Sequence, residues 1–217
     1  SADAQYRTRI IDVSLSGDDY RIRALADRQQ YADPDGLAER AGISSAQWCL
    51  FGQLWPAGRI LAAAMVEFDI AGKRILEIGC GLGLSSLVLQ RRRADITASD
   101  HHPLVEQFLR GNAVRNGITN VEFHVADLFK DVAGLPWTRR PYDSVLLDPP
   151  RAGAREILPV VAGSGARRVV YISCHSGSLA RDAGLLVREH GFRLTAAGVM
   201  DMFPHTTHVE AMAVFDR

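Results

Sequence analysis

The sequence has few cysteines and no excess of charge of either sign. Its 217 residues include three cysteines, and Lys plus Arg equals Asp plus Glu at 25 each. Three widely spaced cysteines form neither a disulfide framework nor a zinc or iron–sulfur ligand set, so we expect no metal and a reduced, cytoplasmic setting. Zero net charge excludes a chain-wide attraction to nucleic acid, so any contact with RNA must be local.

Long apolar runs are absent too. The chain has no stretch of about 18 consecutive apolar residues and no basic segment followed by an apolar one at its start, so we expect no membrane partner. Its length is that of one domain with a small extension. We predict an extension over residues 1–58 and a main domain over residues 59–217. The extension should contain a hairpin, because residues 9–15 and 20–25 alternate apolar and polar side chains, and a short helix over residues 37–42.

Residues 73–83 combine a buried strand with a glycine-rich turn. Residues 75–78 are mostly apolar, as in a strand covered by helices on both faces, and a helix pattern follows the turn. Gly79, Gly81 and Gly83 allow positive φ angles and let a ligand approach the main chain. The Gly-x-Gly-x-x-Gly spacing that cradles a pyrophosphate is absent, because the third glycine comes one residue too early.

Acidic residues accompany this turn. Glu77 precedes the first glycine by two residues, and Asp100 and Asp127 each end a later strand pattern. An acid that ends the second strand can accept hydrogen bonds from both hydroxyls of a ribose. Together with the Gly-x-Gly-x-Gly turn, these residues resemble motif I and the following strands of class I S-adenosylmethionine-dependent methyltransferases. The resemblance implies that S-adenosylmethionine binds here, with Asp127 near the adenine amino group.

From residue 73 onward, strand patterns alternate with helix patterns. This alternation predicts an α/β fold with a doubly wound parallel sheet. The resemblance makes the prediction more specific: a Rossmann-like class I methyltransferase fold with a seven-stranded, mostly parallel sheet, an antiparallel last strand and helices on both faces.

Three stretches after predicted strands carry groups able to perform chemistry: residues 148–154, 173–182 and 201–210. In open α/β sheets, ligands bind beyond the carboxyl ends of the strands, where the first two stretches lie. From about residue 120 to residue 217, the order and spacing of these stretches resemble the RNA uracil-C5 (5-methyluridine) methyltransferases, especially the branch that acts on 23S ribosomal RNA.

This resemblance assigns roles to three residues. Cys174 is the expected nucleophile that adds to C6 of uracil and makes C5 nucleophilic. Glu210 is the expected base that removes the C5 proton after methylation. Asp148 is expected to belong to both the cofactor-binding site and the catalytic site, where it would orient the uracil through a hydrogen bond. Because the last strand is expected to run antiparallel beside residues 168–173, Glu210 should lie near Cys174.

Residues 36–112 resemble a different group, the small protein-lysine and nicotinamide N-methyltransferases. The two resemblances together predict a chain that joins two methyltransferase halves, natural or engineered, with a seam between residues 103 and 121. The leading functional hypothesis is methylation of uracil C5 in RNA, without a separate RNA-binding domain. The alternatives are N-methylation of a protein or small molecule, and a chimeric scaffold that binds S-adenosylmethionine without turnover.

Overall fold

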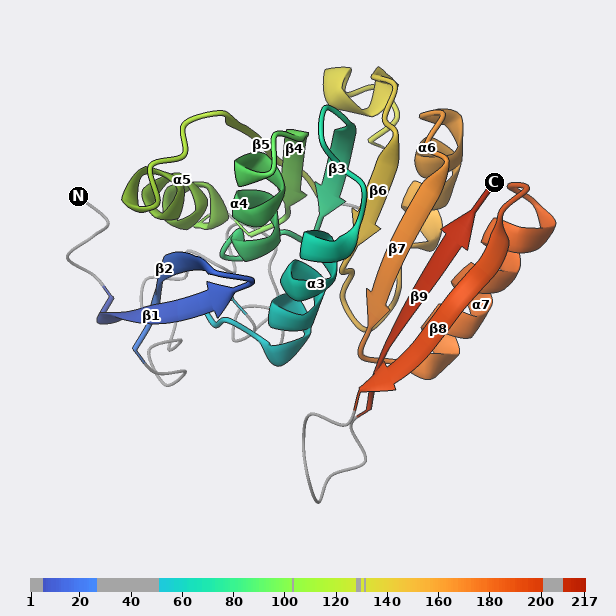
Figure 1. Cartoon of the computed structure of the whole chain (residues 1–217). Helices are drawn as coiled ribbons and strands as arrows, with labels where there is room; N and C mark the ends of the chain where they lie inside the picture. The colour runs from blue at the N-terminus through green and yellow to red at the C-terminus, as the bar shows by residue number, and fades with distance from the viewer. Residues whose placement is uncertain (1–5, 27–50, 103, 128–129, 131, 201–208) are drawn as a thin grey trace.

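The computed structural model describes residues 6–26, 51–102, 104–127, 130, 132–200 and 209–217. These residues form a two-stranded hairpin and a seven-stranded sheet (Figure 1). The strands are β1 (Thr8–Leu15), β2 (Asp18–Leu25), β3 (Arg74–Ile78), β4 (Asp95–Asp100), β5 (Val121–Val125), β6 (Ser144–Leu147), β7 (Arg168–Ser173), β8 (Arg193–Met200) and β9 (Glu210–Asp216).

The large sheet has the strand order β5-β4-β3-β6-β7-β9-β8. Neighbouring strands from β5 to β7 pair in parallel, and β9 pairs antiparallel with both β7 and β8. The predicted class I methyltransferase fold, with its mostly parallel sheet and an antiparallel last strand, is confirmed.

Helices cover both faces of the sheet, as predicted. On one face lie α3 (Pro56–Glu67), α4 (Leu84–Arg91) and α5 (Val105–Arg115); on the other lie α6 (Leu158–Gly163) and α7 (Ser176–Arg188) (Figure 1). Two 3₁₀ helices, η3 (Pro136–Arg139) and η4 (Arg155–Ile157), complete the described elements.

Strand β3 lies inside the sheet, between β4 and β6. Ile75 belongs to the core that contains residues of α3, α4 and α5, whereas Leu76 and Ile78 belong to the core on the opposite face. All three side chains have 0% of their surface exposed. Because successive side chains of a strand point to opposite faces, a continuous apolar run fits a strand that is covered on both sides.

The N-terminal hairpin was predicted correctly, and its strands are longer than the alternating runs indicated. Ser16 and Gly17 have φ angles of 50° and 90°, the positive values of a two-residue turn that matches the twist of paired strands. The short helix expected at residues 37–42 lies outside the described residues.

Asn112 of α5 and Asn116, which caps the C-terminus of that helix, join this hairpin to the main domain. Asn112 Oδ1 accepts the backbone N–H of Arg23 at 2.7 Å, and Asn116 Oδ1 accepts that of Arg21 at 2.8 Å. The amide nitrogens of Asn112 and Asn116 donate back to the carbonyls of the same two β2 residues. Asn112 also donates to the carbonyl oxygen of Leu82 in the glycine turn at 3.1 Å, so one buried side chain connects β2, α5 and that turn.

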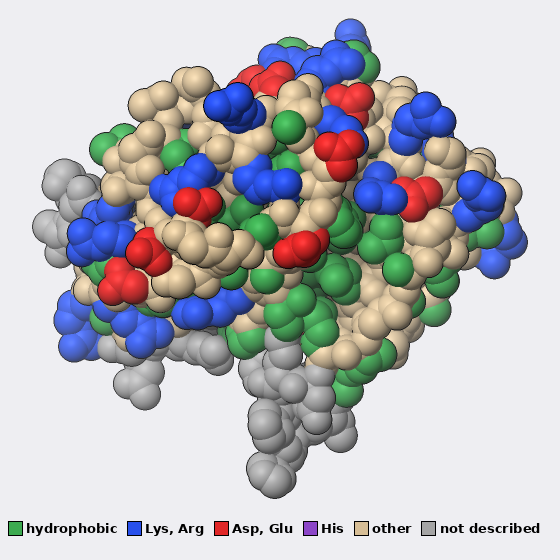
Figure 2. Space-filling model, viewed as in Figure 1, with side chains coloured by type: hydrophobic (Ala, Val, Ile, Leu, Met, Phe, Trp, Pro, Cys, Tyr) green, Lys and Arg blue, Asp and Glu red, His purple; other side chains and the backbone are tan. Residues whose placement is uncertain are grey.

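The sequence prediction did not include α6. Its six residues form an apolar segment, and periodicity cannot distinguish a helix from a strand over so short a run. No described helix is long and apolar enough to cross a membrane. On the face in Figure 2, Lys and Arg side chains are interspersed with Asp and Glu, in keeping with the zero formal net charge.

Candidate functional site

The predicted site residues lie along one edge of the sheet. The parallel strands β3 to β7 all end at this edge, and the antiparallel strand β9 begins there (Figure 1). In register, Ile78 pairs with Ser99 and Leu147, and Ser173 pairs with Ala211. The residues just beyond these positions, which include most of the predicted site, therefore gather at one edge.

The glycine turn after β3 has the predicted backbone conformation. The φ angles of Gly79, Gly81 and Gly83 are 81°, 52° and 85°. A β-carbon on Gly79 would overlap the backbone of Asp148, and one on Gly83 would overlap Leu109. A β-carbon on Gly81 would meet no described atom within 4 Å, so Gly81 is the glycine of this turn that faces open space.

Asp100 ends β4 directly beside this turn. Its Oδ2 accepts the N–H of Gly81 at 3.0 Å, its Oδ1 accepts the N–H of His102 at 3.1 Å, and the His101 ring lies 3.4 Å away. Burial alone would raise the pKa of Asp100. The donors from His101, Gly81 and His102 outweigh burial and hold this pKa below its ordinary value, so Asp100 is a carboxylate at neutral pH.

Glu77 and Asp127 flank Asp100 in different environments. Glu77 is 2% exposed and accepts a hydrogen bond from Ser86 Oγ in α4. Burial raises the pKa of Glu77 to about 7, although the hydrogen bonds from the serines of α4 oppose this shift. Asp127 is half-buried, follows β5 by two residues, and lies 3.4 Å from Lys130 Nζ. The N–H of Ala126 donates to the Asp100 carbonyl at 2.9 Å, which keeps the two strand ends together.

Asp148 follows β6 and lies beside the glycine turn. Its N–H donates to the carbonyl of Ile78 at 2.9 Å. The pKa of Asp148 is raised to about 8. Burial is the main cause, and the negative charges of Glu210, Glu77 and Asp100 contribute the rest. Four carboxyl groups from four strand ends therefore act on one another at this edge, and such a site favours a bound cation.

Cys174 lies in a short, ordered turn between β7 and α7. Ser173 Oγ donates to the carbonyl of His175 at 2.9 Å and accepts its N–H at 3.1 Å. His175 caps α7, because its Nδ1 accepts the N–H of Ser178 at 3.1 Å. Cys174 is exposed and Cys80 is buried, whereas Cys49 lies outside the described residues.

Glu210 and Cys174 come together as predicted. Ser173 of β7 pairs with Ala211 of β9. Because the two strands are antiparallel, Cys174, which follows Ser173, and Glu210, which precedes Ala211, are neighbours at this edge. Glu210 is 8% exposed, and burial raises its pKa. Burial also raises the pKa of the Cys174 thiol, and the charges of Glu210 and Asp148 add to this effect.

Arg151 is a candidate site residue that the sequence reasoning missed. Its positive charge lowers the pKa of the Cys174 thiol against the larger opposing effects. Arg151 is exposed and lies in the loop that follows Asp148. The sequence places it only three residues after Asp148, and that position was the available signal.

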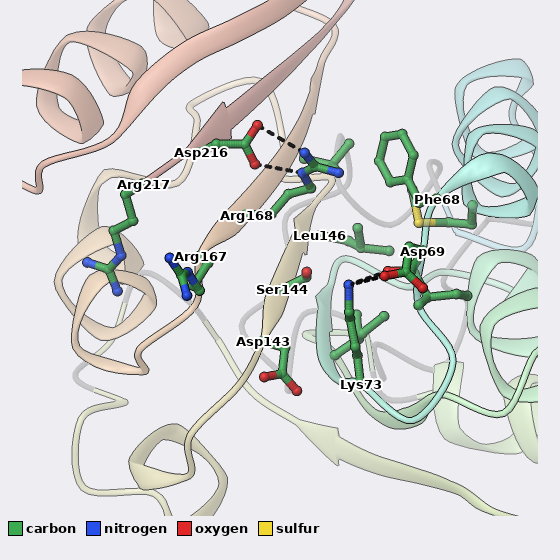
Figure 3. Close-up of a pocket in the computed structure, with 14 residues that line it drawn as sticks. Phe68, Asp69, Lys73, Asp143, Ser144, Leu146, Arg167, Arg168, Asp216 and Arg217 are labelled. Carbon is green, nitrogen blue, oxygen red and sulfur yellow. Dashed lines mark hydrogen bonds and ion pairs between the residues drawn. The ribbon is translucent and has the colours of Figure 1, made fainter.

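The pocket in Figure 3 lies at the opposite edge of the sheet. This cavity of about 400 Å³ is lined by residues from the amino ends of β3, β6 and β7. Its charges largely pair with one another: Arg168 donates twice to Asp216, at 2.6 and 3.0 Å, and Lys73 Nζ lies 3.0 Å from Asp69. Since ligands of such sheets bind beyond the carboxyl ends, the candidate site is the other edge. No cluster of three or more His, Cys, Asp or Glu residues in the described part of the chain has the arrangement of a metal site.

A doubly wound sheet with β9 between β7 and β8, together with a Gly-x-Gly-x-Gly turn and an acid ending the next strand, defines a class I methyltransferase. Solved structures share this fold. They include Pyrococcus abyssi tRNA (uracil-54, C5)-methyltransferase in complex with S-adenosyl-L-homocysteine (TM-score 0.66, 23% identity, 95% of this chain and 44% of that chain). M. jannaschii TYW2 in complex with AdoMet is another (TM-score 0.58, 14% identity, 96% of this chain and 86% of that chain).

The chain belongs to the tRNA (Uracil-5-)-methyltransferase family, whose model matches residues 58–217. The 23S rRNA (uracil(1939)-C(5))-methyltransferase RlmD of Alkalilimnicola ehrlichii is 53% identical over 146 residues, which are 67% of this chain and 33% of that protein. RlmD of Methylococcus capsulatus is 52% identical over 145 residues, with the same coverage. The chain thus spans about a third of the length of these curated relatives.

The family match does not support two of the sequence predictions. One model runs without a break through residues 103–121, where we expected a seam between two methyltransferase halves. The resemblance of residues 36–112 to lysine and nicotinamide N-methyltransferases finds no support among the relatives either. The domain boundary at residue 58 stays a prediction.

Proposed function

We propose that this chain binds S-adenosylmethionine and transfers its methyl group to C5 of a uracil in RNA. The observation that carries this proposal is the pairing of β7 with β9, which brings Cys174 and Glu210 together in a chain of the uracil-C5 methyltransferase family. The relatives named for this reaction support the substrate class, and the reduced thiol that it needs fits a cytoplasmic location.

The residues at the glycine turn fit the cofactor. A carboxylate offers about four lone-pair positions; the N–H groups of Gly81 and His102 occupy two of those on Asp100, and the His101 ring takes a third. One ribose hydroxyl can take the free position, and the other replaces the His101 ring when that side chain turns away. Gly81 leaves room for close approach, and we assign the adenine amino group to Asp127. When bound, S-adenosylmethionine would supply an electrophilic methyl group on a positively charged sulfonium. The carboxyl groups at this edge would stabilise that positive charge.

The chain's own residues then perform the acceptor chemistry. The Cys174 thiolate adds to C6 of uracil, and electron density moves to C5, which takes the methyl group. Glu210 then accepts the C5 proton, the C5–C6 double bond re-forms, and the Cys174 sulfur leaves. Burial raises the pKa of Glu210, which strengthens it as a base. Asp148, whose charge interacts with that of Glu210, can orient the uracil ring through a hydrogen bond.

Two measurements test this proposal. Calorimetric titration with S-adenosylhomocysteine should show saturable binding that Asp100→Ala abolishes. RNA labelled with tritium at uracil C5 should then release tritium when S-adenosylmethionine is added, because only substitution at C5 expels that atom. Cys174→Ala should abolish release and leave S-adenosylhomocysteine binding intact, whereas Cys80→Ala should retain release. Cofactor binding without tritium release from any RNA would contradict uracil methylation and leave a binding scaffold.

A further inference from the structure

A buried carboxylate in α7 joins three segments that surround Cys174. Asp182 is 0% exposed, and its Oδ2 accepts both the N–H of Ala154 at 2.7 Å and the hydroxyl of Tyr171 at 2.6 Å. Its Oδ1 accepts a hydrogen bond from Nε–H of Arg181 at 2.8 Å. One carboxylate therefore binds the loop after β6, the interior of β7 and its own helix.

Arg181 extends this contact along the loop after β6. Its guanidinium donates to the carbonyl of Ala152 at 2.8 Å and forms a 2.7 Å ion pair with Asp182. The loop lies against both side chains at Gly153, where φ is 92°. A β-carbon on Gly153 would stand 2.5 Å from Arg181 and 2.6 Å from Asp182, so only glycine permits this approach.

The three joined segments carry the reactive groups of the proposed site. The loop after β6 begins at Asp148 and includes Arg151, and β7 leads from Tyr171 to Cys174 three residues later. Both Asp148 and Arg151 act on the Cys174 thiol, in opposite directions. Their distances from the sulfur therefore depend on how the loop is held against β7 and α7.

A merely structural role would not need a charge here. Removing a carboxylate from water is costly, and apolar packing often stabilises a buried position at least as well as an ion pair does. A carboxylate does provide several acceptor positions in a small volume, so it can bind a backbone donor and side-chain donors at the same time. This geometry suits a group that holds separate segments at set distances.

We propose that Asp182 is a positioning residue that, with Arg181, fixes the loop carrying Asp148 and Arg151 relative to Cys174 and thereby sets the reactivity of the thiol. The inference deepens the proposed function, because it concerns the same nucleophile. Its primary test uses alkylation of the thiol, which requires neither RNA nor turnover. Asp148 stays tied to β3, because its N–H donates to the carbonyl of Ile78. Loss of the contact should therefore release mainly the exposed Arg151, which moves away from the sulfur and leaves less thiolate at a given pH.

The experiment measures alkylation of Cys174 by iodoacetamide from pH 6 to 10, resolved by peptide mass so that the other cysteines do not interfere. Asp182→Asn should shift the midpoint upward by about half a pH unit, so that alkylation at pH 7 is about 3-fold slower. Arg181→Gln should fold readily, because its side chain is 42% exposed, and should shift the midpoint in the same direction. S-adenosylhomocysteine affinity should change less than about 2-fold in both variants.

Asp216→Asn is the matched control, because it also removes an arginine partner, at the opposite edge of the sheet (Figure 3). It should lower the melting temperature without moving the alkylation midpoint. A coupling test adds specificity: in an Arg151→Ala background, Asp182→Asn should slow alkylation no further, because the two changes remove the same effect.

Unchanged midpoints in both Asp182→Asn and Arg181→Gln would overturn the inference, as would an equal shift in Asp216→Asn. The two proposals can fail separately. If the variants shift the midpoint but the parent protein releases no tritium from uracil-labelled RNA, the positioning role is upheld and the proposed function is contradicted. Where the parent does turn over, Asp182→Asn should lower kcat about 10-fold and leave KM for S-adenosylmethionine unchanged.

Discussion

Gly79 lies so close to Asp148 that a β-carbon on the glycine would overlap the carbonyl oxygen of the aspartate. The turn after β3 and the loop after β6 are thus in backbone contact, which brings the proposed cofactor residues beside the proposed catalytic ones. Parallel pairing of β3 with β6 produces this contact, because Ile78 and Leu147 are partners at the ends of the two strands.

Replacing Gly79 should therefore cost more stability than replacing Gly81. Both have positive φ, so alanine costs about 1 kcal/mol of backbone strain at either position. Gly79→Ala adds a backbone overlap and should lower the free energy of unfolding by about 3 kcal/mol or more. Gly81→Ala should instead weaken S-adenosylhomocysteine binding, because its β-carbon occupies open space. Urea unfolding and calorimetry measure the two effects, and equal losses of stability would contradict this assignment.

Asn112 should be essential to the attachment of the N-terminal hairpin. Asn112→Ala leaves the backbone of Arg23 and the Leu82 carbonyl without their side-chain partner, so the free energy of unfolding should fall by about 2–3 kcal/mol. Asn116→Ala is the matched control, because it removes the analogous pair at a half-buried position, and should cost about 1 kcal/mol. Urea unfolding of both variants checks this order, and a smaller loss for Asn112→Ala would refute it.

Binding of S-adenosylmethionine should release protons near neutral pH. In the free protein the pKa of Asp148 is about 8 and that of Glu77 is about 7, so both groups are substantially protonated at pH 7. A bound sulfonium favours their ionised forms, which lowers both pKa values, and affinity should rise as pH increases from about 6 to 8.

S-adenosylhomocysteine is the matched ligand for this prediction, because it lacks the positive charge. Calorimetry in two buffers of different ionisation enthalpy should detect release with S-adenosylmethionine and much less with S-adenosylhomocysteine. Asp148→Asn should reduce the release, because it removes the group with the larger shift. The same release with both ligands would show that the carboxyl groups do not sense the sulfonium.

Arg151 and Glu210 should affect the Cys174 thiol in opposite directions. Glu210 raises the pKa of the thiol and Arg151 lowers it. Glu210→Gln should therefore speed alkylation at pH 7.5 by about 3-fold, and Arg151→Ala should slow it by a smaller factor. Competition against a small thiol of known pKa measures both rates. Changes of the same sign in both variants would contradict the electrostatic explanation.

The local features of the fold were predictable from sequence because each depends on neighbouring residues. The apolar run of residues 75–78 and the glycines after it specify a buried strand and a tight turn by themselves. The antiparallel position of β9, and with it the approach of Glu210 to Cys174, followed from the family resemblance and is confirmed by the pairing of β7 with β9.

The sequence alone determined the order of the strands along the chain, the glycine turn, and the acids and thiol at the strand ends. Only the tertiary structure decided which distant groups hold those residues in place. Asn112 finds its β2 partner 89 positions away, and Asp182 binds an N–H 28 positions away. Neither side chain stands out in the sequence, because a hydrogen-bond partner is selected by distance in the folded chain and leaves no periodic pattern. The raised pKa of Asp148 has the same origin, since burial and neighbouring charges exist only after the strands have assembled.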